Sequence, residues 1–266
     1  MNNIFSRKNR TLLTELVRTD FKLRYQNSAL GYAWTLLRPL FLFMILYIVF
    51  VRVLKIGDEI PHAPVYLLLG IVLWNFFTEM TAQSLSSIVN RGDLIRKISI
   101  PRWIIVLSTS VSALINLFLN LLIVTVFMVL NHVDLLKTSL LMPLILIEIY
   151  AFALGASLLL SALYVKYRDV NYIWEVGMQG MFYITPILYP LSRIHNVTVK
   201  KLLFLNPMAQ AIQDARYSLV THKSITAGSL LSGSWYMYIP YVVVVVVLVA
   251  GVAYFRSQSK YFAENI

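Results

Sequence analysis

The chain has 266 residues, of which 59% are hydrophobic and only 13% are charged. A soluble domain carries roughly 25% charged residues, so this composition excludes an ordinary soluble enzyme and indicates an integral membrane protein. Lys and Arg outnumber Asp and Glu by 23 to 12, an excess that membrane topology and anionic lipid explain better than nucleic acid does. Because the chain has no cysteine, disulfides and thiol chemistry are also excluded.

The first element expected is an amphipathic helix ahead of the first apolar stretch. Arg18 and Lys22 flank a set of apolar residues that recur at every fourth position: Leu13, Val17, Phe21 and Tyr25. Positions four apart share one face of a helix, and an apolar face flanked by cations is typical of a helix in the membrane interface. Residues 1–34 are therefore predicted to form a cytoplasmic or interfacial segment.

Six transmembrane helices should follow, since a helix needs about 20 residues to cross the hydrocarbon. Charge-poor stretches place them at about residues 35–53, 63–81, 104–130, 139–163, 172–187 and 236–255. They predict an all-α integral membrane protein with one domain over residues 35–256 and a tail over residues 257–266. Most Lys and Arg residues fall in the connections that are cytoplasmic if the N-terminus is. Both termini are therefore predicted to be cytoplasmic.

The fifth predicted span is unusually short because Pro186 and Pro190 interrupt it. After it, Asn206 followed by Pro207 is typical of a helix N-cap and its first-turn proline. One apolar stripe then predicts a short amphipathic helix on the outer surface: Met208, Ile212, Ala215 and Leu219. A short span leading into such a helix indicates a re-entrant segment on the outer side between spans five and six.

The third predicted span carries a polar face with two possible roles. Its four polar residues are spaced four apart and so share one side of the helix: Ser108, Ser112, Asn116 and Asn120. Such side chains often hydrogen-bond between helices, and they could equally form the polar wall of a channel. The sequence leaves both interpretations open.

Three carboxylates lie within or beside the spans: Glu79, Glu148 and Glu175. Glu148 is interpreted as the only one near mid-depth, where an acidic residue is a functional candidate. No Lys or His occurs in a span near it. Both a structural role and a proton relay in a proton-coupled carrier remain open for it.

Missing motifs restrict the chemistry further. No metal site is expected because the four histidines show no ligand spacing: His62, His132, His195 and His222. No G-x-x-x-x-G-K-[ST] loop occurs in the chain, so nucleotide phosphates are not expected to bind here in the usual way. Acids and histidines do not cluster into a catalytic site. We therefore expect no cofactor in this chain, and any ATP and Mg²⁺ should be bound by a partner subunit.

Four motifs give the chain a family resemblance. The run DFKLRYQNSALGYAWTLLRPL over residues 20–40 contains an R-Y-x-x-S-x-L-G-x-x-W pattern followed by a proline. It resembles the segment that leads into the first span of ABC-2-type permeases that export bacterial surface polysaccharides. NRGDLIRKISIPRW over residues 90–103 resembles their cytoplasmic connection between spans two and three, and Tyr167-Arg168-Asp169 follows span four as in the family. TPILYPLSRI over residues 185–194 is similar to their outer gate region.

The resemblance implies a homodimer of six-span subunits that encloses a channel in the bacterial plasma membrane, with two ATPase subunits on the cytoplasmic face. It implies a substrate polymer on an undecaprenyl-type lipid, such as O-antigen, teichoic acid, capsule or rhamnose-rich wall polysaccharide. The alternative within the wider family is an ABC-2 permease for a drug or small lipid. The alternative outside it is a proton-coupled carrier that uses Glu148. Membrane lipids are expected as partners, and nucleic acid is not.

The resemblance also assigns roles to individual residues. It implies a gate through which the lipid-linked substrate enters, formed by Arg24, Tyr25, Ser28 and Trp34. It implies a coupling helix that contacts the ATPase through Leu94, Ile95, Lys97 and Pro101. It also implies an outer gate at Tyr183, Pro186 and Tyr189.

Overall fold

The computed structural model describes residues 7–25, 30–55, 60–97, 100–134, 137–231 and 235–262. Every regular element within these ranges is a helix, which confirms the predicted all-α class. The α-helices are α1 (Arg7–Tyr25), α2 (Trp34–Tyr47), α3 (Ala63–Asn90), α4 (Gly92–Lys97), α5 (Trp103–Leu130), α6 (Met142–Lys166), α7 (Val170–Ile184), α8 (Val197–Leu203), α9 (Pro207–Leu219), α10 (Ala227–Leu230) and α11 (Ile239–Gln258). Short helical turns extend several of them: η1 (Gly31–Ala33), η2 (Ile48–Val53), η3 (Lys137–Leu141), η4 (Leu191–Arg193), η5 (Trp235–Tyr238) and η6 (Ser259–Tyr261).

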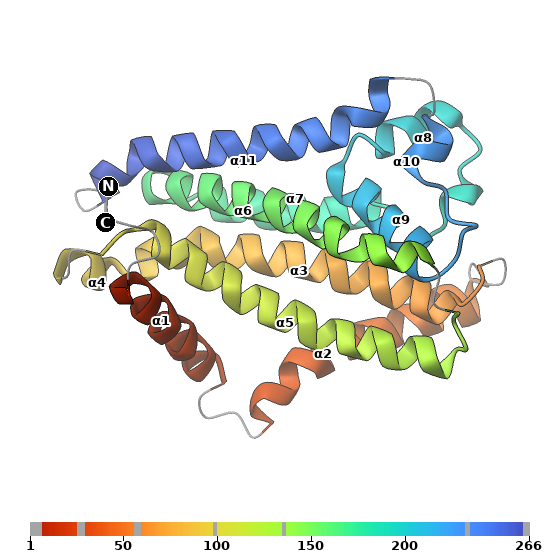
Figure 1. Cartoon of the computed structure of the whole chain (residues 1–266), viewed down its shortest axis with the longest axis horizontal. Helices are drawn as coiled ribbons and strands as arrows, with labels where there is room; N and C mark the ends of the chain where they lie inside the picture. The colour runs from red at the N-terminus through yellow and green to blue at the C-terminus, as the bar shows by residue number, and fades with distance from the viewer. Residues whose placement is uncertain are drawn as a thin grey trace.

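The long helices α3, α5, α6 and α11 run along the long axis of the molecule (Figure 1). Helix α3 is central, because it packs against α2, α5, α6, α7 and α9. Helix α6 packs against both α3 and α11, and α1 lies obliquely against α5 (Figure 1). The start of α1, α4 and the end of α11 lie at one end of the bundle, called the α4 end below (Figure 1). Helices α8, α9 and α10 lie at the opposite end, called the α9 end.

Within the described residues, five helices are long and apolar enough to cross a membrane: Trp34–Val53, Ala63–Asn90, Trp103–Leu130, Lys137–Lys166 and Trp235–Tyr261. They correspond to predicted spans one to four and six, so the multi-pass architecture is confirmed. The predicted fifth span corresponds to α7. Its 15 residues extend about 22 Å, which is less than the roughly 30 Å of hydrocarbon. It ends where Thr185 becomes extended ahead of Pro186, and the count of six spans stays a prediction.

The second predicted span is longer than expected. Helix α3 continues to Asn90 rather than ending near residue 81, because polar residues of its last turns find partners on α5. The hydroxyl groups of Ser84 and Thr109, for example, lie 2.8 Å apart. Glu79 therefore lies well inside its helix and not at its end. The interpretation of Glu148 as the carboxylate near mid-depth stays a prediction.

Helices α6 and α11 make backbone contact at a pair of glycines. A Cβ atom added to Gly251 would lie only 2.2 Å from the carbonyl oxygen of Gly155. A Cβ atom on Gly155 would lie 2.6 Å from the Cα atom of Leu248. Small residues allow this close approach, which is how helices associate where lipid supplies no hydrophobic driving force between them.

Helix α9 has the predicted start but not the predicted exposure. The Asn206 side chain accepts a hydrogen bond from the backbone N–H of Met208 at 3.0 Å, and Pro207 occupies the first turn. The expectation of an amphipathic helix with one exposed side is wrong, because its residues are buried on almost every side against α3, α6 and α11. Its place on the outer side of the membrane stays a prediction. Its polar side chains also have partners in neighbouring elements, so burial leaves few of them unsatisfied.

Candidate functional site

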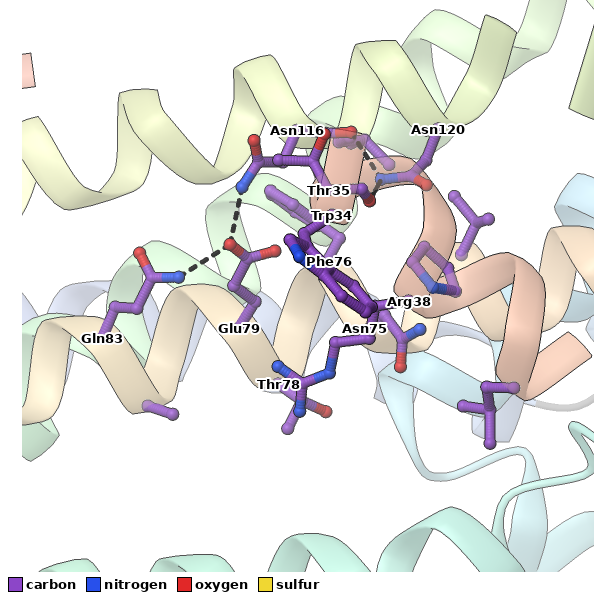
Figure 2. A pocket seen from close by; sticks show the side chains of 15 residues that line it. Trp34, Thr35, Arg38, Asn75, Phe76, Thr78, Glu79, Gln83, Asn116 and Asn120 are labelled. Carbon is purple, nitrogen blue, oxygen red and sulfur yellow. Dashed lines mark hydrogen bonds between the residues drawn. The ribbon is translucent and has the colours of Figure 1, made fainter. Parts of the chain in front are cut away.

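A cavity of about 700 Å³ lies between α2, α3 and α5 (Figure 2). Its volume is within the range of about 300–1,000 Å³ that small-molecule sites occupy. Aromatic side chains of Trp34 and Phe76 contribute to its wall. The polar lining residues are Thr35, Arg38, Asn75, Thr78, Glu79, Gln83, Asn116 and Asn120. Since all three helices belong to candidate membrane spans, this is a polar space at membrane level.

Glu79 on α3 organises one side of the cavity. Its Oε1 atom accepts a hydrogen bond from Nδ2 of Asn116 on α5 at 2.6 Å (Figure 2). The same oxygen accepts another from Nε2 of Gln83, one turn further along α3, at 2.7 Å. Hydrogen bonds to an ionised acceptor are stronger than neutral ones. The carboxylate is therefore held in place from two helices.

Asn120 connects the cavity wall to α2. Its Nδ2 atom donates to the backbone carbonyl of Asn116 at 2.8 Å and to that of Thr35 at 3.4 Å (Figure 2). Arg38 lines the cavity one turn after Trp34. Pro39 follows within the helix and, having no backbone N–H, it cannot donate to the carbonyl of Thr35 four residues earlier. The Asn120 amide donates to that carbonyl instead.

The cavity has the chemistry of a binding site for a hydroxyl-rich ligand. Amides and a carboxylate hydrogen-bond to hydroxyl groups, and the faces of Trp34 and Phe76 offer apolar surface to the C–H face of a sugar ring. Arg38 adds a guanidinium, which suits a phosphate group. Among the lining residues Glu79 is the sole acid and there is no histidine, so the wall lacks a general acid–base pair.

The predicted polar face of α5 divides into two parts. Asn116 and Asn120 line the cavity, whereas Ser108 and Ser112 are fully buried in helix packing. Ser108 accepts a hydrogen bond from Nη1 of Arg91 at 2.9 Å, and the Ser112 hydroxyl donates to the Ser108 carbonyl at 3.0 Å. Hydrogen bonding between helices is therefore confirmed for Ser108, Asn116 and Asn120, and the wall of a channel stays a prediction.

The residues of the predicted substrate gate are only partly described. Trp34 is half-exposed and lines the cavity together with Asn116 and Asn120. The backbone of Arg24 and Tyr25 forms the end of α1, and their side chains lie outside what the structure describes. Ser28 lies outside the described residues altogether. The structure thus joins one predicted gate residue to two predicted channel residues.

Three residues of the predicted coupling helix, Leu94, Ile95 and Lys97, lie in α4, which follows α3 at the α4 end (Figure 1). Their contact with the ATPase stays a prediction. Ile95 is buried against the apolar side chains of Ile88 and Ile105. Leu94 and Pro101 are partly buried, and the side chain of Lys97 lies outside the described part. Ile95 therefore anchors α4 to the ends of α3 and α5 instead of projecting from the protein.

The predicted outer gate contains one exposed residue and two fixed ones. Tyr183 is exposed at the end of α7. The Tyr189 hydroxyl donates to the carbonyl of Ile184 at 2.8 Å. Pro186 is buried, and its carbonyl accepts a hydrogen bond from Nη1 of Arg216 at 2.6 Å.

Arg216 on α9 was not singled out by the sequence, yet it holds the turn after α7. Its guanidinium is fully buried and lies over the ring of Tyr66, with Cζ 3.6 Å from the ring centroid. Beside the Pro186 bond, its Nη2 atom donates to the carbonyl of Ile187 at 2.6 Å and its Nε atom to the carbonyl of Tyr66 at 3.1 Å. A Cβ atom on Gly70 would lie 2.5 Å from Nη2, so Gly70 supplies the space.

A second polar cluster lies where α6, α9 and α11 meet. The Nε2 atom of Gln210 donates to Oδ2 of Asp214 at 2.6 Å and to the hydroxyl of Tyr241 at 3.2 Å. Burial raises the pKa of the Asp214 carboxyl, although these polar neighbours partly offset the rise. Glu148 is partly buried nearby, and its Oε1 atom has no hydrogen-bond partner among the described residues. No pattern in the sequence indicated that Asp214 would be the neighbour of Glu148.

The family of ABC-2 type transporters matches residues 11–220 of the chain. A protein of Myxococcus xanthus named O-antigen export system permease protein RfbA is 29% identical over 97% of this chain and 96% of its own length. Two proteins of Klebsiella pneumoniae with the same name are 29% and 28% identical, each over 95% of this chain and 94% of its own length. Since the family match covers well over half of the residues, the chain belongs to the ABC-2 type transporter family.

Proposed function

We propose that the chain is the membrane-spanning subunit of an ATP-driven exporter of lipid-linked surface polysaccharide. The observation that carries the proposal is the polar cavity between α2, α3 and α5, in a chain whose described residues include five candidate spans. Family membership and relatives named O-antigen export permeases support it. The chain supplies the path through the bacterial plasma membrane, and separate ATPase subunits bind ATP and Mg²⁺.

The cavity serves the glycan end of this substrate. Glu79, Asn116 and Asn120 hydrogen-bond to sugar hydroxyls, Trp34 stacks against a ring face, and Arg38 attracts the phosphate that joins sugar to lipid. Trp34 and Arg38 of α2 form one wall of the cavity, and Pro39 makes this helix easier to deform. Trp34, one of the predicted gate residues, therefore lies at the cavity itself.

The working assembly is a homodimer with the α4 end facing the cytoplasm. Lys and Arg crowd into the connections at that end, and α4 contacts the ATPase there. The exposed side of α7 that carries Glu175 and Gln179 supports a second copy as partner, since lipid is a poor solvent for such polar side chains. Gly177 and Gly180 lie on another side of the helix. Nothing lies within 4 Å of Cβ atoms added to them, which leaves room for close helix packing there.

An ABC-2 permease for a drug or small lipid is the second candidate. The observation that favours it is the size of the cavity, which suits a drug-sized ligand as well as it suits a sugar. A proton-coupled carrier built on Glu148 would require that carboxyl for transport. A Glu148→Gln variant that exports as the wild type does removes this alternative.

Reconstitution with the ATPase subunits in proteoliposomes tests the proposal. A fluorescent lipid-linked oligosaccharide should cross the bilayer only with ATP, and Asn116→Leu should reduce its export at least tenfold while the complex stays assembled. This variant keeps the side-chain volume but removes the amide that holds Glu79. The matched control is Thr125→Val, a polar-to-apolar change on an exposed position of α5 away from the cavity.

The proposal is wrong if wild-type complex leaves the glycolipid in place but exports a hydrophobic drug. It is also wrong in its site if Asn116→Leu exports the glycolipid at the wild-type rate.

A further inference from the structure

Arg91 connects the end of α3 to two other helices. It is the residue between α3 and α4. Its Nη1 atom donates to Oγ of Ser108 on α5 at 2.9 Å, and its Nη2 atom forms an ion pair with Oδ1 of Asp20 on α1. Ser108 in turn donates to the carbonyl of Ile105 at 2.8 Å. One guanidinium thus joins α1, the α3–α4 junction and α5.

This ion pair is shielded from water. The side chains of Arg91 and Asp20 are 17% and 19% exposed, and Oδ2 of Asp20 is buried without a hydrogen-bond partner among the described residues. Around it, α1 packs along α5. Shielded charges interact more strongly than exposed ones, and removal of one partner leaves the other without compensation.

Helix α4 is firmly attached to this junction. It begins at Gly92, next to Arg91, and the N–H of Ile95 donates to the Arg91 carbonyl at 3.1 Å. The Ile95 side chain is buried among apolar residues at the ends of α3 and α5. A displacement of α4 therefore moves the Arg91 side chain, and with it the Asp20 carboxylate of α1.

We propose that Arg91 is a positioning residue that couples movement of α4 to α1 through Asp20. This inference rests on the proposed function, in which α4 contacts the ATPase and α1 ends at Arg24 and Tyr25, two residues of the predicted substrate gate. A push on α4 then shifts α1 as one body with the α3–α4 junction. The end of α1 consequently changes position in step with ATP binding.

The test uses the complex with its ATPase and four variants of the chain. Asp20→Asn and Arg91→Gln should each leave co-purification and basal ATP hydrolysis intact but reduce export at least tenfold. The exchanged pair, Asp20→Arg with Arg91→Asp, should export at least three times as fast as either single variant, because the two opposite charges again attract each other. Glu15→Gln, an exposed acid on the same helix, should export as the wild type does.

A distance measurement separates coupling from a structural role. Because the chain has no cysteine, cysteines introduced at the exposed positions Thr19 on α1 and Arg96 on α4 take spin labels selectively in the permease. In the wild-type background the label-to-label distance should not change when ATP is trapped. With Asp20→Asn the distribution of label-to-label distances should broaden or shift when ATP is trapped, because α1 no longer follows α4.

Wild-type export by Asp20→Asn would overturn the inference, and so would loss of ATPase co-purification in both single variants or no recovery in the exchanged pair. If the wild-type complex exports no glycolipid while the labels respond as expected, the proposed substrate is wrong and the coupling through Arg91 stands.

Discussion

Replacing Arg216 by methionine should release the turn after α7 from α3. The guanidinium donates three hydrogen bonds to the carbonyls of Tyr66, Pro186 and Ile187, and all three groups are buried with it. Methionine fills a similar volume but donates nothing. The carbonyls of Pro186 and Ile187 would then lose the charged donor that holds them.

The magnitude follows from these three bonds. Interhelical hydrogen bonds in a membrane protein average about 0.6 kcal/mol, and bonds to a charged group in soluble proteins contribute about 1.5–3 kcal/mol. Three bonds bracket the loss between about 2 and 9 kcal/mol. At roughly 2–4 °C per kcal/mol for a chain of this size, even the lower bound lowers the thermal midpoint by about 4–8 °C.

The assay is the thermal midpoint of the purified chain, followed by the loss of its monodisperse chromatographic peak. Gly70→Ala perturbs the same contact from α3, since its Cβ would lie 2.5 Å from Nη2 and 3.2 Å from Cζ of Arg216. It should destabilise the wild type but add little to Arg216→Met, because the obstructed group is then gone. Gly228→Ala is the control, as its nearest neighbour is Oγ1 of Thr226 at 3.8 Å. A midpoint for Arg216→Met within 1 °C of the wild type (about 0.5 kcal/mol or less) would refute the reasoning.

Three further substitutions test other contacts. Gly251→Ala should force α6 and α11 apart, because the new Cβ would meet the Gly155 carbonyl at 2.2 Å. Its midpoint should fall by several degrees, whereas Gly228→Ala, whose Cβ has its nearest neighbour at 3.8 Å, should not lose stability. Asn206→Ala removes the cap of α9 and should cost about 1 kcal/mol, seen as a lower midpoint that Asn206→Asp largely avoids. Burial raises the pKa of Asp214 above its ordinary 3.8, so the folded chain holds that proton more tightly and stability falls as pH rises above 3.8; Asp214→Asn should flatten this part of the stability profile, and an unchanged slope contradicts the assignment.

The membrane spans were predictable because each depends on a local property of the chain. Long charge-poor stretches predicted the helices that begin near Trp34, Trp103 and Trp235, and the Asn206–Pro207 pair predicted the start of α9. The error at the end of α3 has a physical cause. Hydropathy falls after residue 81, but the polar residues there form hydrogen bonds with α5. A hydropathy profile cannot detect this tertiary contact, because it averages only neighbouring residues in the sequence.

The site was predictable only in part, for the same reason. Spacing placed Asn116 and Asn120 on one face, but it could not show that Glu79, from another helix, binds the first of them. The nearly complete burial of α9 was not predicted, because an apolar stripe indicates only one buried side. Arg216 and Gln210 have hydrogen-bond partners that allow the other sides to be buried too. From the sequence, Arg91 could not be distinguished from the other predicted cytoplasmic cations, because only the structure shows its ion pair with Asp20.

The enclosure of α3 affects how the chain can be made. Over its 18-residue apolar stretch, α3 has a mean hydropathy of 1.5, and 78% of that stretch is buried. The corresponding stretch of α5 has a mean hydropathy of 2.6 and is 33% buried. The helix that faces lipid least is thus also the one that lipid would retain least well. During synthesis α3 leaves the ribosome before α5, α6 and α9 exist, so it must wait in the bilayer with its carboxylate and amides uncovered. A nascent chain cut short before α5 should therefore slip out of the membrane or be degraded.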